Sequence, residues 1–232
     1  YMTEKFFVSY DGKKVGYREW MPTTEPKGLV QIAHGMAEST ARYDEFAEYL
    51  KNRGFLVFGD DHRGHGLTDG RTGYSDGEMF EDTLKDMATL TKMYKENYPD
   101  LPFVIFGHSY GSFLTQRYIE LYGDTVDAAV IGGSAYLKDF SVVAARFVAK
   151  WNCFFGKGDK PAELIKKLSF DKYNKIYDDG TTFISQLPEE CRRYEKAEDC
   201  NFTLSNNFYK SFFSGLPKTY KAKNYSKIPK DL

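Results

Sequence analysis

The pentapeptide at residues 107–111 places Ser109 between Gly107 and Gly111, at the end of the apolar run 102–106. A helical pattern starts near Tyr110, so Ser109 would occupy a tight turn between a strand and a helix. Such a turn needs neighbours without bulk, and it holds the serine oxygen out at the top of a sheet. We therefore predict that Ser109 is a nucleophile. A serine that only caps the following helix is the alternative.

Acyl transfer at a serine needs more than the hydroxyl. A base must remove the proton, and two donors must stabilise the oxyanion of the tetrahedral intermediate. The backbone N–H of Tyr110 follows the serine directly and is the first expected donor. The second should lie in the loop His34-Gly35-Met36, which follows the first parallel strand, and we assign it to the N–H of Met36. No step requires the His34 imidazole, so we expect that side chain to shape the loop through hydrogen bonds.

The elements that position these residues alternate between strand and helix patterns. A polar, glycine-containing turn at residues 10–13 predicts two antiparallel opening strands. Apolar positions spaced three and four apart predict helices, the longest between Phe80 and Tyr98. Short apolar runs typical of buried strands occupy residues 28–33, 55–59, 103–106 and 126–131. This rhythm predicts an α/β fold, a mostly parallel sheet with helices on both faces.

Such sheets bind ligands beyond the carboxyl ends of their strands. The loop at residues 34–35, the polar loop at residues 60–66 and Ser109 all follow predicted strands. We therefore expect these three features to meet at one edge of the sheet.

The rhythm changes after residue 134. Short aromatic-rich helical patterns follow, at residues 147–155, 162–168 and 208–213. We interpret residues 1–134 as the core, 135–225 as a helical cap inserted above the sheet, and 226–232 as the start of a return to the core. More core, without a cap, is the alternative.

Composition excludes several classes of partner. With 32 basic and 33 acidic residues and no block of like charge, a nucleic-acid partner is not expected. No apolar stretch approaches the roughly 20 residues of a membrane span, and no signal peptide is recognisable, so we expect a cytoplasmic protein. Three cysteines without a CxxC or HExxH motif predict no zinc site and no disulfide framework, although Cys191 and Cys200 are a conceivable pair. No metal or cofactor is expected.

Three motifs together carry a family resemblance. They are HGMAESTARY at 34–43, DHRGHGLT at 61–68 and GHSYG at 107–111. Their order and spacing resemble the α/β-hydrolase fold and, within it, the monoacylglycerol lipase and lysophospholipase branch. The resemblance extends over residues 6–134 and is looser across the cap. It implies a serine hydrolase that cleaves carboxylic esters of single-chain lipids, monoacylglycerol or lysophospholipid, through an acyl-serine intermediate.

The resemblance also assigns roles to individual residues. Ser109 matches the nucleophile, and Met36 and Tyr110 match the oxyanion positions. Thr68 stands where the branch usually has serine, and it retains a hydroxyl. The loops that support the site are matched by His34, Gly35, Asp61, Arg63, His65, Gly107 and Gly111.

The base is the component that the sequence does not show. In this fold the acid and the histidine follow the nucleophile, but His34, His62, His65 and His108 all precede Ser109. His108 adjoins the serine and should point elsewhere, and the others lie in motifs with supporting roles. We expect the chain to stop before the strand that leads to the acid and the histidine. It would then be an inactive fragment that lacks the last strands of its sheet.

Further expectations follow from this interpretation. The sheet would have an open edge, covered by a partner chain or by a C-terminal fragment. The aromatic-rich cap would suit an acyl chain and transient contact with a membrane surface. Two alternatives stay open: a peptidase or other small-molecule hydrolase of the same fold, and a non-catalytic binding pseudoenzyme that keeps the pocket without the base.

Overall fold

The computed structural model describes residues 1–68, 70–168, 177 and 181–232. In these ranges one sheet of six strands has the order β1-β2-β4-β3-β5-β6. Strand β1 pairs antiparallel with β2, β2 pairs antiparallel with β4, and the remaining pairs are parallel, which confirms the predicted hairpin and the mostly parallel sheet. The strands are β1 (Met2–Val8), β2 (Lys14–Trp20), β3 (Gly28–Ala33), β4 (Phe55–Asp60), β5 (Phe103–His108) and β6 (Ala128–Gly132).

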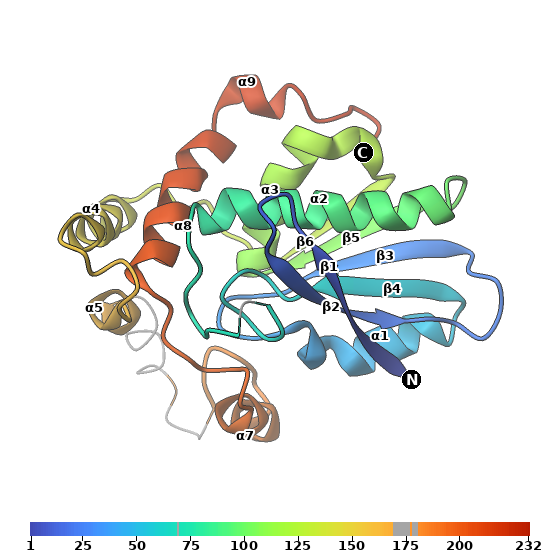
Figure 1. Cartoon of the computed structure of the whole chain (residues 1–232), viewed down its shortest axis with the longest axis horizontal. Coiled ribbons are helices and arrows are strands. Elements are labelled where there is room, and N and C mark those ends of the chain that lie inside the picture. The colour runs from blue at the N-terminus through green and yellow to red at the C-terminus, as the bar shows by residue number, and fades with distance from the viewer. Residues whose placement is uncertain (69, 169–176, 178–180) are drawn as a thin grey trace.

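Helices cover both faces of this sheet, as predicted (Figure 1). Helix α1 (Asp44–Lys51), which follows the 3-10 turn η1 (Thr40–Tyr43), packs on one face with Trp20, Val30 and Val57. Helices α2 (Met79–Asn97) and α3 (Tyr110–Tyr122) pack on the other face, and the short turn η2 (Gly123–Thr125) leads from α3 to β6. Every residue of β3 is buried because it lies between two strands and two helical layers.

The strand register brings the predicted site loops together. Ala33 at the end of β3 pairs with Gly107 near the end of β5, and Gln31 pairs with Phe58 of β4. The loops that follow these three parallel strands therefore leave the same edge of the sheet. This is the convergence expected from the sequence.

Of the helices after β6, α4, α5 and α8 lie at the left in Figure 1, whereas α7 lies at the bottom and α9 at the top of the view. The predicted pieces at 147–155 and 208–213 were too short, because Asp139 and Ser205 accept hydrogen bonds from the backbone and start these helices earlier. Two further helices, α7 and α9, were not predicted. The helices are α4 (Phe140–Phe154), α5 (Glu163–Lys166), α7 (Pro188–Lys196), α8 (Asn206–Thr219) and α9 (Ala222–Tyr225).

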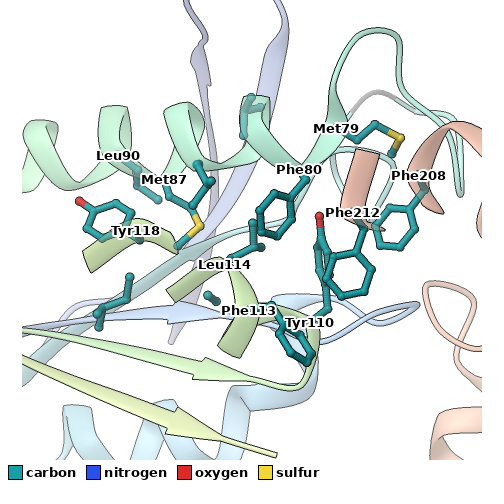
Figure 2. Packing of buried hydrophobic residues seen from close by; sticks show 14 of the residues in the cluster. Met79, Phe80, Met87, Leu90, Tyr110, Phe113, Leu114, Tyr118, Phe208 and Phe212 are labelled. Atoms are coloured by element: carbon teal, nitrogen blue, oxygen red, sulfur yellow. The ribbon is translucent and has the colours of Figure 1, made fainter. Parts of the chain in front are cut away.

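Helix α8 is packed into the main core. Figure 2 shows Phe208 and Phe212 beside Tyr110 of α3 and Phe80 of α2. The ring centroids of Tyr110 and Phe212 are 5.1 Å apart, and those of Phe80 and Phe212 are 5.7 Å apart. A Cβ at Gly215 would lie 2.4 Å from Phe80, so a glycine is needed where α8 approaches α2. One part of the predicted cap is therefore core as well.

Strand β6 differs from the other parallel strands. Over the described residues it pairs with β5 alone, so one of its edges is open. Its side chains are also exposed, with Val130 at 46% and Ile131 at 41%. An open edge at this end of the sheet agrees with the expectation from the sequence.

Three further features bear on the sequence analysis. Cys153, Cys191 and Cys200 are free thiols, so Cys191 and Cys200 do not form the disulfide considered as an alternative. Among the described helices, none combines the length and the apolar character that a membrane crossing requires. The described side chains also contain no group of three or more acidic, histidine or cysteine ligands placed to hold a metal ion.

Candidate active site

Ser109 lies at the turn between β5 and α3, with φ 51° and ψ −117°. A residue with a Cβ rarely adopts this conformation, which costs about 1–3 kcal/mol. Gly107 and Gly111 permit the turn, since a Cβ at Gly107 would lie 2.4 Å from the Gly111 carbonyl oxygen. The Ser109 side chain makes no capping hydrogen bond to α3. Ser109 therefore lies on a strained strand-to-helix turn, the backbone geometry expected of a nucleophile, and the alternative role as a helix cap is not found.

The loop after β3 is packed directly against the elbow. A Cβ at Gly35 would lie 3.4 Å from the Ser109 Cβ, and a Cβ at Gly111 would lie 1.9 Å from the Ala33 carbonyl oxygen. Ser109 has no hydrogen-bond partner for its hydroxyl within the described ranges, and the same holds for the backbone N–H of Tyr110. Both predicted groups are thus free to meet a substrate.

The backbone N–H groups of residues 35–37 differ in their hydrogen-bond acceptors. The Gly35 N–H donates to the Glu38 carboxylate at 2.6 Å, and the Ala37 N–H donates to His65 Nε2 at 3.1 Å. The Met36 N–H has no acceptor among the described residues. The amide assigned from the sequence is therefore the one that the loop leaves unpaired.

Ser109 opens into a cavity of about 470 Å³. One wall comes from the 35–38 loop and the other from residues that follow β6, far along the chain. The cavity thus forms between the carboxyl edge of the sheet and residues from Lys166 to Tyr209. Its apolar lining includes Met36, Ile184, Tyr194, Phe202, Leu204 and Tyr209.

Three buried histidines lie together beside this loop, and the rings of His34 and His62 are stacked. The ring centroids of His34 and His62 are 3.9 Å apart, and those of His34 and His65 are 5.2 Å apart. The His34 ring bonds to the Gly35 carbonyl at 2.7 Å and to the His62 N–H at 2.9 Å. His34 therefore shapes the loop, as expected. His108 is exposed beside the ring of Tyr43.

None of these histidines is hydrogen-bonded to the Ser109 hydroxyl in the part of the chain that the structure describes. The ring nitrogens of His34, His62 and His65 are instead engaged with backbone atoms and with Asp60. The described contacts therefore identify no partner that takes the Ser109 proton, and the position of the base stays a prediction.

Asp61, Arg63 and Thr68 support the architecture around the site. Asp61 accepts the Thr40 N–H at 2.9 Å, the Leu67 N–H at 2.9 Å and the Arg18 guanidinium at 2.7 Å. The Thr68 hydroxyl donates to the Asp61 carbonyl at 2.6 Å, so the hydroxyl retained at this position is used. Arg63 is fully buried and pairs with Asp86 and Asp11. These contacts tie the 60s loop to its neighbours.

Sequence reasoning did not place Glu38 in the site. Its carboxylate accepts from the Gly35 N–H, from the Tyr43 hydroxyl at 2.7 Å and from Arg42 at 2.5 Å. The signal was present, because Glu38 is the only acid in HGMAE and a buried carboxylate needs partners. Asn201, whose N–H donates to the Ala37 carbonyl at 2.9 Å, carried no such signal.

The buried titratable groups give the fold a defined pH dependence. Burial lowers the pKa values of His34 and His65 well below the usual value. In the unfolded chain these imidazoles bind protons below about pH 6.5, whereas in the folded protein they stay neutral. Protonation therefore favours the unfolded state, and the folded protein loses stability as the pH falls below about 6.5. Burial raises the pKa of Asp86 to about 6, even beside Arg63, which opposes the loss. Asp60 and His62 form a hydrogen-bonded pair, and burial raises the pKa of Asp60 and lowers that of His62, so the two shifts have opposite effects on the pH dependence.

We expect the free energy of unfolding to be about 2 kcal/mol lower at about pH 5 than at about pH 7. The stability lost through the buried, neutral His34 and His65 exceeds the stability gained through Asp86. Urea unfolding, followed by circular dichroism at constant ionic strength, measures the difference. Equal stability at the two pH values would contradict the neutral, buried state of His34 and His65.

The strand order, the serine at the strand-to-helix elbow and the unpaired amide of the β3 loop define an α/β-hydrolase. A family model described as "Serine aminopeptidase, S33", a hydrolase family, matches residues 24–230. The chain belongs to this family.

Known relatives agree with this assignment. A "Monoacylglycerol lipase" from Mycolicibacterium smegmatis is 33% identical over 133 residues, which are 57% of this chain and 47% of that protein. A "Monoglyceride lipase" from Mus musculus is 40% identical over 110 residues, 47% of this chain and 35% of that protein. The matched part thus spans less than half of each of these two relatives. The chain is a monoacylglycerol-lipase-like α/β-hydrolase, and the resemblance drawn from the three motifs is confirmed.

Solved structures support the fold over nearly the whole chain. A thermostable carboxyl esterase from Bacillus coagulans has a TM-score of 0.85 at 26% identity, covering 99% of this chain and 77% of that one. A monoglyceride lipase from Saccharomyces cerevisiae has a TM-score of 0.70 at 19% identity, covering 95% of this chain and 70% of that one. At 19% identity, the yeast structure supports the fold and no more specific property.

Proposed function

We propose that this protein hydrolyses the carboxylic ester of a monoacylglycerol or of another single-chain lipid, such as a lysophospholipid, through an acyl-Ser109 intermediate. The observation that carries the proposal is the position of Ser109, whose strained elbow opens into a cavity beside the unpaired Met36 N–H. The names of the lipase relatives and of the carboxyl esterase support an ester substrate.

In the proposed reaction, Ser109 Oγ attacks the ester carbonyl and the N–H groups of Met36 and Tyr110 stabilise the oxyanion. The alcohol leaves with a proton, and water then releases the fatty acid from the serine. The apolar part of the cavity lining would hold the acyl chain. We assign the core to residues 1–134, the cap to 135–225 and the return to the core to 226–232.

We further propose that the proton acceptor for Ser109 comes from outside the described residues. The open edge of β6 is the place where added strands, from a partner chain or from a C-terminal segment, would bring an acid and a histidine to this edge of the sheet. Without that addition, the proposal assigns no ordinary turnover to these 232 residues.

The test compares esters with amides on protein expressed from its full reading frame. Short-chain and long-chain monoacylglycerols and aminoacyl amides are incubated separately, and a fluorophosphonate probe reports the reactivity of Ser109. We expect ester cleavage and probe labelling, both lost in Ser109→Ala and both retained in Ser134→Ala, which changes an exposed serine. Faster amide cleavage would instead support the peptidase alternative. Lipid binding without cleavage or labelling would support the pseudoenzyme.

Helix α4 has an apolar face that suits contact with a lipid surface. Phe140, Val143, Phe147, Trp151 and Phe154 recur at helical spacing and are between 50% and 85% exposed. The helix is held by packing against α8. An exposed apolar stripe of this kind, on a helix packed against α8, would bring the protein to a lipid surface that holds its substrate.

Replacing Phe147 and Phe154 by serine is expected to weaken binding to phosphatidylcholine vesicles about tenfold or more, because two exposed phenyl rings are lost. Trp151 reports binding through a blue shift of its emission, since Trp20, the other tryptophan, is buried. Val8→Ser is the matched control, because Val8 is an exposed apolar residue on β1. If the double variant and the control bind alike, α4 is not the membrane contact.

A further inference from the structure

In the peptide group that joins Gly35 to Met36, the carbonyl oxygen has a hydrogen-bond partner and the N–H has none among the described residues. Its carbonyl oxygen bonds to His34 Nδ1 at 2.7 Å, whereas its N–H, that of Met36, has no acceptor among the described residues. The C=O and N–H of a trans peptide are rigidly opposed, and none of the described peptides is cis. Fixing the carbonyl therefore also fixes the direction of the Met36 N–H.

The partners of the His34 ring determine where its proton lies. Nε2 faces the backbone N–H of His62 at 2.9 Å, and an N–H can only donate, so Nε2 is the acceptor. In a neutral imidazole the proton is then on Nδ1, which donates to the Gly35 carbonyl. The neutral form fits the surroundings, because the ring is completely buried and stacks on His62. Burial also lowers the pKa of His34.

The flanking amides restrict the loop further. The Gly35 N–H is held by Glu38 and the Ala37 N–H by His65, so the peptides on either side of the Gly35–Met36 group are also fixed. Ala37 has a left-handed backbone, φ 55°, which reverses the chain direction at this point. Of the N–H groups of Gly35, Met36 and Ala37, that of Met36 is the one without an acceptor among the described residues.

We infer that His34 is a positioning residue, whose imidazole carries a one-way hydrogen-bond chain from the His62 N–H through the Gly35 carbonyl to the Met36 N–H. The two hydrogen bonds at the His34 ring point in the same direction as the bond that the Met36 N–H would donate to an oxyanion, so each polarises the next and makes this N–H a stronger donor. No proton is transferred. The inference deepens the proposed function, on which it rests, because the group that the chain strengthens is the oxyanion donor at Ser109.

The direction of the chain can be tested without any activity. Nitrogen-15 NMR of the imidazoles at about pH 7 should show His34 protonated on Nδ1 and unprotonated on Nε2. The Met36 amide proton should move upfield in His34→Leu, which removes both ring contacts, while amides remote from the loop keep their shifts. A His34 proton on Nε2 would reverse the chain and overturn the inference, whatever the enzyme does.

The kinetic test uses two variants that differ in one contact. Asparagine at residue 34 keeps an N–H donor near the Gly35 carbonyl, and leucine keeps none. Relative to wild type, the maximal rate of Ser109 labelling by a fluorophosphonate should fall about 100-fold in His34→Leu and about tenfold in His34→Asn, with the probe affinity unchanged. Equal rates in the folded leucine variant and the wild type would overturn the inference.

Two further outcomes are distinguishable. If His34→Leu does not fold, the comparison of His34→Asn with wild type decides the kinetic arm, and equal rates there would count against the inference. If the wild-type protein is not labelled, the proposed function fails, but the NMR measurement still decides the direction of the hydrogen-bond chain.

Discussion

Gly111→Ala is expected to abolish accumulation of folded protein. The added Cβ would lie 1.9 Å from the Ala33 carbonyl oxygen, 2.4 Å from the Ala33 carbonyl carbon and 2.7 Å from the His34 carbonyl oxygen. All three are backbone atoms of the central strand and its loop, so no side chain can move aside. Helix α3 would have to withdraw from β3, at a cost of about 4 kcal/mol or more, which is a large share of the stability of an ordinary domain.

Soluble yield and thermal unfolding by circular dichroism measure this effect. Gly158→Ala is the matched control, since a Cβ there would meet its nearest neighbour, the Cys153 sulfur, at an ordinary 3.6 Å. We expect the control to melt with the wild type. A Gly111→Ala protein that melts close to both would show that the approach of α3 to β3 is looser than described.

Arg63→Met is expected to have the second largest effect. The Arg63 guanidinium lies 2.7 Å from Asp86 and 2.6 Å from Asp11, and it also donates to Ser9. It thus connects the 60s loop with α2 and with the β1–β2 turn. Without it the buried Asp86 carboxylate keeps the Ser9 hydroxyl as a donor but has no cationic partner, and we expect a loss of about 3–5 kcal/mol in the free energy of unfolding.

Urea unfolding tests this loss against a matched surface variant. Arg71 also pairs with a carboxylate, that of Asp159 at 3.0 Å, but it is 53% exposed, so Arg71→Met should cost less than about 1 kcal/mol. Adding Asp86→Asn to Arg63→Met should recover part of the stability, because the unpaired charge is then removed. Equal losses in Arg63→Met and Arg71→Met would contradict the structural role assigned to the buried cluster.

Much of the fold could be predicted because its signals are local. The runs at 28–33, 55–59 and 103–106 are apolar and bounded by polar or glycine residues, so they could be recognised as strands that are covered on both sides. The helices of the cap were less predictable. Helix α7 reads PEECRRYEK, and only Cys191 and Tyr194 of it are buried, so its apolar stripe is too narrow to stand out.

The candidate site likewise contains residues that could be predicted from local sequence and contacts that could not. Ser109, Met36 and Tyr110 could be proposed because their roles depend on a turn and a loop of a few residues. The contacts that hold the loop from outside depend on tertiary packing. The Asn201 N–H reaches the Ala37 carbonyl, and the Tyr209 hydroxyl lies 3.6 Å from the Met36 sulfur, in each case across more than half of the chain. No pattern of spacing in the sequence encodes such pairs.

The backbone conformation at Ser109 also limits which residues can replace this serine during evolution. At φ 51° and ψ −117°, a second heavy atom on Cβ would crowd the adjoining peptides, so threonine is disfavoured despite its hydroxyl. Cysteine branches no more than serine does and would fit the same turn. Replacement by cysteine, with its thiol, is therefore compatible with this backbone, whereas replacement by threonine, a secondary alcohol, is not.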